Sequence, residues 1–504
     1  MNDVEICLKN LVNNKSPGPD AIPINVLKYC SSALAGPLTE LFNHSLKIGV
    51  FPSRWKHAHV TPILKKGSRY KVCNYRPISL LPVLSKIFEK LLHIEIYRHV
   101  SKHIAPEQHG FVSQRSTVTN LVEYTRDIAT HINNKDQVDS VYTDFSKAFD
   151  SVDHQLLIHK IQGYGICGQL LDLLTDYLLK RTQTVVIDAG RSTTEQVTSG
   201  VPQGSILGPL LFTLFVNDIT QCFQSSKCLM YADDLKIYRS IRTIQECVLL
   251  QSDLDCLVAW CQVWRLKLNV LKCNVITFTI KKTKTIIFNY QIQDDLLIRV
   301  QSIKDLGVMM SSDLSYNKHL HMIRPKAYRL LGLMKRNCFR KLSPATNRLI
   351  YISLVRPQME YGSVIWNPYH VTKISFVEKV QQRFVKLHTL NCCVPKDDYK
   401  AKLNFLNLMS LRDRRKLMDM TFLFKIIRGG VDSCSLPFLN FYVPPRASRS
   451  QTIFRLNSFR IDLFKHTSII RLQSTFNTLA SLNHDLDINF NTLIQFKALI
   501  KSVL

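Results

Sequence analysis

The stretch KCLMYADDLKIY, residues 227–238, decides the fold because two adjacent aspartates stand between two strand-like segments. Apolar and aromatic residues on both sides favour strands, whereas the acids Asp233 and Asp234 favour a turn. Two carboxylates about 4 Å apart repel by roughly 4 kcal/mol at an effective dielectric constant near 20, so we expect a positive charge nearby. The alternative is an exposed turn without function, since aspartate is common in turns.

A third aspartate has a similar setting. In SVYTDFSKAFDSVDH, residues 140–154, Asp144 follows the apolar strand VYT and precedes a helix. Strand ends that meet at one edge of a sheet can bring Asp144 together with Asp233 and Asp234. Three carboxylates without histidine or cysteine favour Mg²⁺, with Mn²⁺ as the alternative. Two such ions about 3.5–4 Å apart promote phosphoryl transfer, a chemistry that polymerases and nucleases share.

The composition describes a globular protein with a polyanionic partner. The chain has 504 residues, of which 46% are hydrophobic and 21% charged, and this length suggests two or three domains. Its 66 basic and 38 acidic residues give a net charge of +28 that is spread along the whole chain. Nucleic acid is therefore the favoured partner, and an anionic membrane surface is the alternative.

Cysteine usage and hydropathy bear on the location of the protein. Fourteen cysteines lie at irregular spacings, and the opening MNDVEICLKN does not resemble a secretory leader. We therefore expect reduced thiols in a nuclear or cytoplasmic protein. Neither Cys392–Cys393 nor Cys222 with Cys228 has the spacing of a zinc site. We expect no membrane span, because even the mostly apolar run of residues 80–97 carries Lys86, Glu89 and Lys90.

Periodicity predicts an α+β protein. Up to about residue 140 we expect a strand at HVTPIL, residues 59–64, and two amphipathic helices. From 139 to about 310 the pattern changes to short strands separated by helices, and beyond 315 it is mostly helical. The second amphipathic helix has one apolar face, formed by Val118, Leu121, Val122, Thr125, Ile128, Ala129 and Ile132.

Particular segments are predicted to form these strands and helices. We expect a hairpin that joins TQTVVID, residues 182–188, to EQVTSG, residues 195–200. We expect strands at VITFTI, residues 275–280, and at TIIFNYQI, residues 285–292. Residues 411–427 predict a helix with a basic and an apolar face. A domain boundary near 430–450 is indicated by Pro437, Pro444 and Pro445.

Three segments, in order, resemble the palm motifs of reverse transcriptases: YTDFSKAFDSVDH, SGVPQGSILGPLLF and YADDLKIY. Viral RNA-copying polymerases more often carry glycine in place of Ala232. The chain resembles more closely the reverse transcriptases of non-LTR (LINE-like) retrotransposons of the jockey group, and the likeness runs from about residue 10 through nearly the whole chain. The segments that narrow the family are KSPGPDAIPINVLK, NYRPISLLPVLSKIFEKLL, QHGFVSQRSTVTNLV, WCQVWRLKLNVLKC, KDLGVMM and LVRPQMEYGSVIWNPY.

The resemblance implies roles for particular residues. Asp144, Asp233 and Asp234 match the family's metal ligands. Phe149 falls where these enzymes place an aromatic ring beneath the sugar, which excludes a 2′-hydroxyl; the alternative is an ordinary core phenylalanine. Gln203 and Gly204 fall near the incoming base and the template, although Gly204 alone fits a turn equally well.

Four basic residues also match family positions. Lys65, Lys66 and Arg76 lie where related enzymes hold the triphosphate, and their charges could complement its phosphates. Lys272 resembles the lysine that protonates the leaving pyrophosphate. For each of the four, an ordinary exposed base is the alternative.

Other polar and aromatic residues are assigned to structure. Asp150 and Asp153 lie where a helix begins, so we expect them to stabilise its first turn. His154 and His159 are expected on a helix face without metal partners. Trp260 and Trp264 stand four residues apart on one helical face and are expected in the core.

The implied fold is a right-hand polymerase. Residues 1–45 would extend the fingers, and residues 46–311 would form the reverse transcriptase domain, with fingers to about 140 and a palm with an antiparallel sheet from 141 to 311. Residues 312–430 would form a helical thumb or connection, and residues 431–504 a basic C-terminal region.

The implied function is RNA-directed DNA synthesis. The enzyme would extend the 3′-hydroxyl of a DNA primer with dNTPs on an RNA template. Complete elements place an endonuclease before the polymerase, and we expect none here because KSPGPD begins at residue 15. The alternatives are a catalytically idle or domesticated RNA-binding remnant and a metal-dependent nuclease. The oligomeric state stays open.

Overall fold

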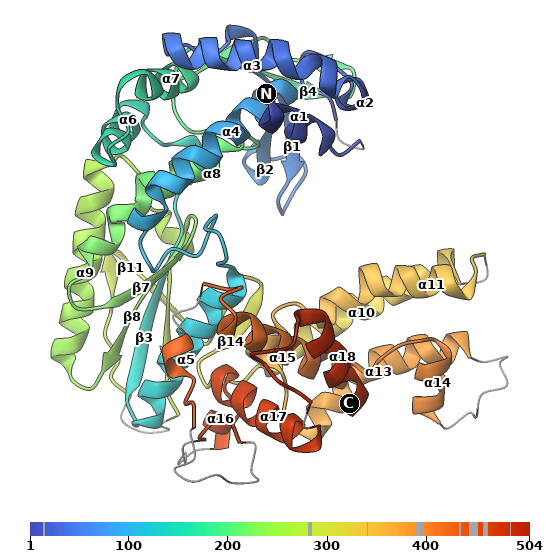
Figure 1. Cartoon of the computed structure of the whole chain (residues 1–504). Coiled ribbons are helices and arrows are strands. Elements are labelled where there is room, and N and C mark those ends of the chain that lie inside the picture. The colour runs from blue at the N-terminus through green and yellow to red at the C-terminus, as the bar shows by residue number, and fades with distance from the viewer. Residues whose placement is uncertain are drawn as a thin grey trace.

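The structure is a computed structural model with the shape of a letter C (Figure 1). A helical part with one sheet carries the N-terminus, a second sheet forms the back of the C, and a helical part carries the C-terminus. The described residues are 1–13, 16–280, 285–339, 341–389, 395, 398–432, 435–442, 452–456, 462–483 and 485–504.

The central sheet forms the back of the C. Neighbouring strands are antiparallel, except that the edge strand β12 runs parallel to β9. Helix α5 (Thr117–Asn133) packs against β3 and β7, and α9 (Ile244–Val263) packs against β8. The strands in spatial order are β12 (Ile298–Val300), β9 (Asn274–Phe278), β3 (Gln137–Thr143), β8 (Asp234–Ile241) and β7 (Lys227–Tyr231).

Both faces of this sheet are buried. Alternate residues of each strand point to opposite sides of the sheet, and each side packs into a different hydrophobic cluster. Val138 and Tyr238 share one hydrophobic cluster with α5. Val141 and Ile237 belong to the other cluster, with residues of α9 and of α8 (Leu207–Val216). The predicted apolar face of the second amphipathic helix is confirmed, since all its members except Val118 are buried in α5.

The first sheet lies in the N-terminal part. Strand β1 contains the predicted segment HVTPIL, pairs antiparallel with β2 and pairs parallel with β4. The hairpin predicted from residue 182 is confirmed, but its returning arm is divided into two short strands that both pair with β4. The strands are β1 (His57–Leu64), β2 (Tyr75–Leu80), β4 (Arg181–Ile187), β5 (Gly190–Arg191) and β6 (Glu195–Val197).

Aromatic packing holds the helices of this part together. The ring of Phe42 stacks on Phe88 with centroids 4.7 Å apart, and Phe51 meets Tyr177 edge to face at 5.0 Å. The helices are α1 (Asn2–Lys9), α2 (Ile24–Tyr29), α3 (Ser31–Ile48), α4 (Val83–Val100), α6 (His154–Gly163) and α7 (Gly168–Leu178).

The helical prediction beyond residue 315 is confirmed, and the helix predicted for residues 411–427 is α15 (Leu411–Ile427). Its basic face is only partly exposed, because Arg415 is fully buried and donates from Nε to Asn367. The other helices are α10 (Asn317–Asn337), α11 (Pro344–Ile350), α12 (Ser363–Trp366), α13 (Val371–His388), α14 (Tyr399–Phe405), α16 (Asp462–Lys465), α17 (Ser468–Leu482) and α18 (Leu493–Val503).

The strand expected at residues 285–292 is wrong for most of its length. Within this segment only Gln291–Ile292 forms a strand, β10, which pairs in a short hairpin with β11 (Asp295–Leu296). The backbone of Ile286 instead bonds the side chain of Gln137, at 2.9 Å through its N–H and 2.8 Å through its carbonyl. A side chain of the neighbouring strand therefore satisfies the groups that a strand would have paired.

A second hairpin was not predicted. Strands β13 (Ser302–Asp305) and β14 (Val308–Ser311) pair around a turn in which Leu306 and Gly307 have positive φ angles of 42° and 92°. This turn is part of the KDLG segment. It presents Asp305 to the central sheet, where the residue enters the site.

Three further expectations concern cysteines and membranes. The cysteines in the described part of the chain are free. Cys392 and Cys393 lie outside the described residues. Within the described ranges, no helix combines the length and apolar character that crossing a bilayer requires.

Candidate active site

The hairpin predicted around the paired aspartates is present. Tyr231 at the end of β7 pairs with Asp234 at the start of β8, and Ala232 adopts a positive φ of 58° in the turn. The side chain of Gln108 accepts a hydrogen bond from the Ala232 N–H at 3.0 Å. A Cβ on Gly110 would lie 2.3 Å from the same nitrogen, so only glycine allows this approach. The QHG segment therefore braces the turn.

Asp144 lies at the same end of the central sheet. Thr143 is paired with Leu235, so the register continued by one residue places Asp144 opposite Asp234. The backbone carbonyl of Asp144 accepts a hydrogen bond from the Asn269 N–H at 2.7 Å, which holds the strand end against the segment that leads to Lys272. The fold thus brings together acids that are about 90 residues apart in the chain.

The pKa values of Asp233 and Asp234 are raised, first by desolvation and then by neighbouring carboxylates. Desolvation by the surrounding protein raises the pKa of Asp234 to about 6, and the charges of Asp233, Asp305 and Asp144 act in the same direction. Desolvation and the Asp144 charge also raise the pKa of Asp233, while Lys65 and Arg76 oppose this rise. Such a group of carboxylates binds positive charge favourably.

Lys272 supplies one such charge. Its Nζ lies 2.6 Å from Oδ2 of Asp144, and both side chains are partly exposed. The short helix Val270–Lys272 presents the lysine to the strand end. The structure therefore brings this predicted residue into direct contact with a predicted metal ligand.

A buried ion pair behind Asp234 was not predicted. Lys236 donates to Asp305 at 2.6 Å, and the hydroxyl of Tyr142 donates to the same carboxylate at 3.0 Å. Asp234 and these three residues line a small cavity of about 360 Å³. Burial lowers the pKa of Lys236, and Asp305 opposes this change. The sequence held a signal, because strand alternation places Lys236 on the same face as Asp234.

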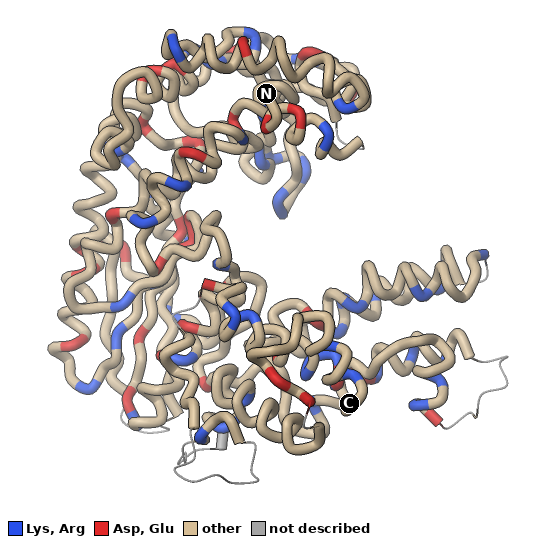
Figure 2. Tube along the Cα trace, in the orientation of Figure 1, with Lys and Arg blue, Asp and Glu red and all other residues tan. Residues whose placement is uncertain are grey.

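The predicted triphosphate residues lie on the hairpin of β1 and β2. Arg76 is paired with Ile63, and the backbone N–H of Lys65 donates to Asn74 at 2.8 Å. Both side chains are exposed, and both lower the pKa of Asp233, so their charges act on the aspartate group. Lys66 is also exposed, but within the described part of the chain its side chain has no hydrogen bond or ion pair. Figure 2 shows basic residues along this hairpin.

Phe149 occupies a position between core and surface. Its ring stacks on Phe212 of α8 with centroids 4.2 Å apart, and it meets Phe111 edge to face at 6.0 Å. The side chain is only partly buried. Stacking on a buried ring fixes the orientation of Phe149 while part of its surface stays accessible.

Gln203 and Gly204 connect the first sheet to the site. The carbonyl of Gln203 accepts from the Ser79 N–H in β2 at 2.7 Å. Gly204 has a φ of 131°, and a Cβ there would lie 2.3 Å from the Ser79 carbonyl oxygen. Glycine at this position is therefore required by a close approach of two backbones as well as by φ. The side chain of Gln203 donates to Asp150 at 2.7 Å.

The expectation for the two helix-start acids is half right. Asp153 caps α6 and accepts from the backbone N–H groups of Gln155 and Leu156 at 3.0 and 3.1 Å. Asp150 instead lies in the one-turn helix Ala148–Asp150 and holds Gln203. It does not cap α6, because the chain continues for three residues before that helix begins.

The positions of His154 and His159 on α6 and of Trp260 in the core are confirmed, whereas Trp264 is only partly buried and follows the last residue of α9. His154 is buried with Nε2 2.8 Å from the Gly200 carbonyl, and His159 is exposed on α6. Trp260 is buried, and Trp264 packs against it with centroids 6.3 Å apart. The ammonium group of Lys160 lies 3.6 Å from the centre of the Trp264 ring, which adds a cation–π contact.

The donor atoms at the site suit a hard divalent cation. Asp144, Asp233 and Asp234 offer carboxylate oxygens alone, and their mutual repulsion favours an added positive charge. Within the described ranges, no three His, Cys, Asp or Glu side chains already surround one point as a formed metal site. The chemistry of the residues thus fits Mg²⁺, although their side chains are not arranged as a closed coordination shell.

Comparison with known proteins agrees with this site. Residues 63–313 match the family model described as reverse transcriptase (RNA-dependent DNA polymerase). The probable RNA-directed DNA polymerase from transposon X-element of Drosophila melanogaster is 31% identical over 393 residues, which is 75% of this chain and 42% of that protein.

Two other relatives from Drosophila melanogaster are each 29% identical. The probable RNA-directed DNA polymerase from transposon BS aligns over 401 residues, 76% of this chain and 44% of that protein. The RNA-directed DNA polymerase from mobile element jockey aligns over 397 residues, 75% of this chain and 43% of that protein. The chain therefore spans less than half the length of these relatives. It belongs to the reverse transcriptase family, in the jockey-like group of non-LTR retrotransposons.

Proposed function

We propose that this chain is an RNA-directed DNA polymerase that extends the 3′-hydroxyl of a DNA primer with dNTPs on an RNA template. The observation that carries the proposal is the meeting of Asp144 with the Asp233–Asp234 turn at one end of the central sheet, inside the matched reverse transcriptase segment. We place the protein in the nucleus, the cytoplasm or both.

The proposed architecture is a right hand. The fingers comprise an N-terminal extension, residues 1–45, and the chain to about 140. The palm spans 141–311, the thumb or connection 312–430 and a basic C-terminal region 431–504. Two contacts join the proposed fingers to the proposed palm: β4 pairs with β1, and α5 packs on the central sheet.

Asp144, Asp233 and Asp234 would hold Mg²⁺ or Mn²⁺. Two such ions, when bound, would lower the pKa of the primer hydroxyl and stabilise the charge that develops on the phosphate. Lys272, which contacts Asp144, would donate a proton to the leaving pyrophosphate. Lys65 and Arg76, with Lys66 beside them, would bind the triphosphate by charge.

Selection of the nucleotide would depend on shape. The ring of Phe149, held by Phe212, would lie beneath the sugar and leave no room for a 2′-hydroxyl. Gly204 would let the backbone approach the base pair that forms, while Gln203 is held by Asp150. These residues would act by excluding wrong substrates rather than by moving protons.

Primer extension tests the proposal directly. Purified protein is incubated with an RNA template, an annealed DNA primer, dNTPs and Mg²⁺, beside the Asp233→Asn variant. We expect extension by the unaltered chain alone, with equal RNA affinity for both proteins. RNA affinity should fall by roughly 10³–10⁵ between 50 and 200 mM salt if 6–10 phosphates are bound.

Two other results would replace the proposal. RNA binding without extension would support a binding remnant, which the net charge of +28 alone would also explain. Cleavage of nucleic acid without added dNTPs, lost in Asp233→Asn, would indicate a metal-dependent nuclease that uses the same acids.

A further inference from the structure

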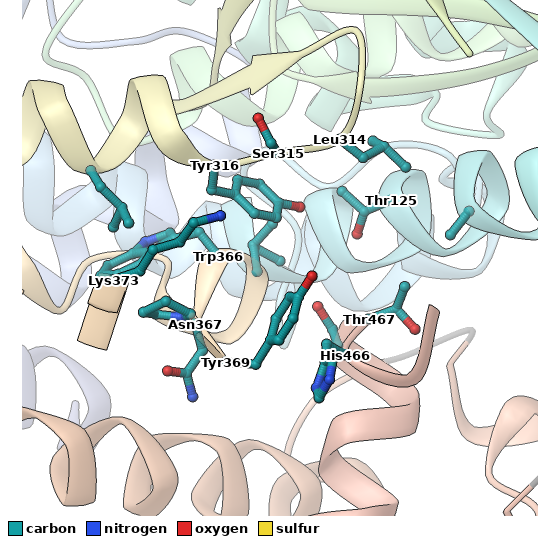
Figure 3. Close-up of a pocket in the computed structure, with 15 residues that line it drawn as sticks. Thr125, Leu314, Ser315, Tyr316, Trp366, Asn367, Tyr369, Lys373, His466 and Thr467 are labelled. Carbon is teal, nitrogen blue, oxygen red and sulfur yellow. The ribbon is translucent and has the colours of Figure 1, made fainter. Parts of the chain in front are cut away.

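A cavity lies at the junction of four chain segments (Figure 3), and none of the three aspartates lines it. Its walls come from α5, the start of α10 with the loop before it, the stretch from α12 into α13, and the residues that precede α17. Its empty volume is about 730 Å³, counting the part open to solvent.

The walls are rich in flat aromatic groups. Tyr369 stacks on His466 with ring centroids 3.8 Å apart and an angle of 8° between the planes. Trp366 is buried and fixed by a hydrogen bond from its indole N–H to the Tyr361 carbonyl at 2.7 Å. Tyr316 lines the cavity as well. Rigid aromatic walls favour a planar guest that can stack.

Polar groups of the cavity wall can form hydrogen bonds with the edge of a planar ligand. In Figure 3 the hydroxyl ends of Tyr316 and Tyr369 and the side chain of Thr125 point toward the middle of the cavity. The hydroxyl of Tyr316 has no hydrogen bond to another described residue, and burial raises its pKa, so it stays neutral. A neutral phenol both donates and accepts, as the polar edge of a nucleobase requires.

Lys373 adds a positive charge to the wall. It lines the cavity from the first turn of α13, and within the described part of the chain its ammonium group has no ion pair. Proteins bind unpaired nucleotides by combining aromatic rings, on which the nucleobase stacks, with a basic side chain that has no other ion pair. Apolar walls alone would not distinguish such a ligand from any aromatic compound.

We propose that this cavity binds a single nucleotide, with its base between the aromatic walls and its phosphate beside Lys373, at a site separate from the aspartate group. The net charge of +28 favours an unpaired nucleotide within an RNA strand over a free mononucleotide. The choice of RNA rests on the proposed function, whereas the nucleotide site itself does not.

Photo-cross-linking tests the site. RNA that carries 4-thiouridine is irradiated with the full chain and with Asp233→Asn, and cross-linked peptides are identified by mass spectrometry. We expect cross-links within residues 366–373 in both proteins. Because Asp233→Asn removes only the proposed polymerase chemistry, cross-links that persist without primer extension would separate the two proposals.

Substitutions of residues that line the cavity make the test more specific. Lys373→Ala should lower the yield of cross-links within residues 366–373 on the order of tenfold, the scale of one charge-assisted hydrogen bond. Tyr316→Phe removes a single hydroxyl and should lower it less. Lys379→Ala is the matched control, because Lys379 is exposed on the same helix and does not line the cavity. Circular dichroism verifies the fold of each variant.

Saturation-transfer NMR with AMP, GMP, CMP and UMP distinguishes the two sources of the ligand. Mononucleotide signals that are lost in Lys373→Ala, without cross-links from RNA, would retain a nucleotide site but assign it to free nucleotides. The proposal is overturned if RNA cross-links lie only outside residues 366–373 and no mononucleotide binds, or if Lys373→Ala and Lys379→Ala behave alike.

Discussion

Acidic residues have opposite surroundings in two regions of the molecule. At the end of the central sheet, Asp144, Asp233 and Asp234 are partly or largely exposed, and desolvation and mutual repulsion raise the pKa of the latter two. At the junction of α12, α15 and α17, Asp419 is buried and accepts hydrogen bonds from Arg471 at 3.0 Å and Asn367 at 2.9 Å.

This contrast distinguishes a functional site from a structural one. A buried acid whose partners already satisfy it stabilises the fold and has nothing left to offer a ligand. A cluster of acids with too few bases costs folding energy and regains it when a cation binds. The junction is thus structural, and the sheet end is the place to look for chemistry.

The largest expected effect is on catalysis. Asp144→Asn should lower primer extension by at least about 10³-fold, because the loss of a metal-ligand charge removes several kcal/mol of transition-state stabilisation. The melting temperature should change little, since repulsion with Asp233 and Asp234 is relieved while the pair with Lys272 is lost. Extension kinetics and thermal unfolding provide the measurements, and an unfolded variant would make Asp144 structural.

The matched substitution at the junction should lower the stability of the fold rather than act on catalysis directly. Asp419→Ala leaves the buried guanidinium of Arg471 without its carboxylate, which typically costs about 3–5 kcal/mol of stability. Denaturant unfolding measures this loss, with Asp485→Ala, a substitution of an exposed acid, as the control. If Asp419→Ala were as stable as the control, the claim that Asp419 stabilises the junction would be wrong.

Lys272 tests whether the bases at the sheet end are functional. Lys272→Ala should lower the rate of extension by about 10²-fold, the lower end for loss of a general acid. Its partly exposed pair with Asp144 should contribute less than about 1 kcal/mol to stability. The pH profile decides: loss of the alkaline limb together with the rate supports proton donation, whereas a uniform fall supports positioning of Asp144.

The smallest effect concerns pH. The pKa of Asp234 is raised to about 6 in the folded protein, so between its ordinary value of 3.8 and 6 the folded state binds more protons than the unfolded state. The contribution of this group to stability must therefore fall as pH rises through that window. Without added divalent ions, Asp234→Asn should flatten this dependence in melting temperatures between pH 4 and 6.5. An unchanged slope would show that Asp234 is solvated like an ordinary surface acid.

Local features of the chain could be predicted because they depend on neighbours in sequence. The hairpin around Asp233 follows from apolar residues on both sides of two acids, and α15 has the predicted bounds Leu411–Ile427 because its apolar period is helical. The strand expected at residues 285–292 failed because Gln137, from another strand, captures the backbone of Ile286. No pattern within the segment contains that partner.

The order of residues is enough to predict that two acids stand at a hairpin tip, that a third ends another strand and that positive charge lies close to them. Which bases supply that charge is set by the fold: Lys272 lies beside Asp144, Lys236 is held by Asp305, and the β1–β2 hairpin lies near Asp233. The need for compensation is set by local charge, whereas the choice among 66 bases is made by strand register and packing between segments far apart in the chain.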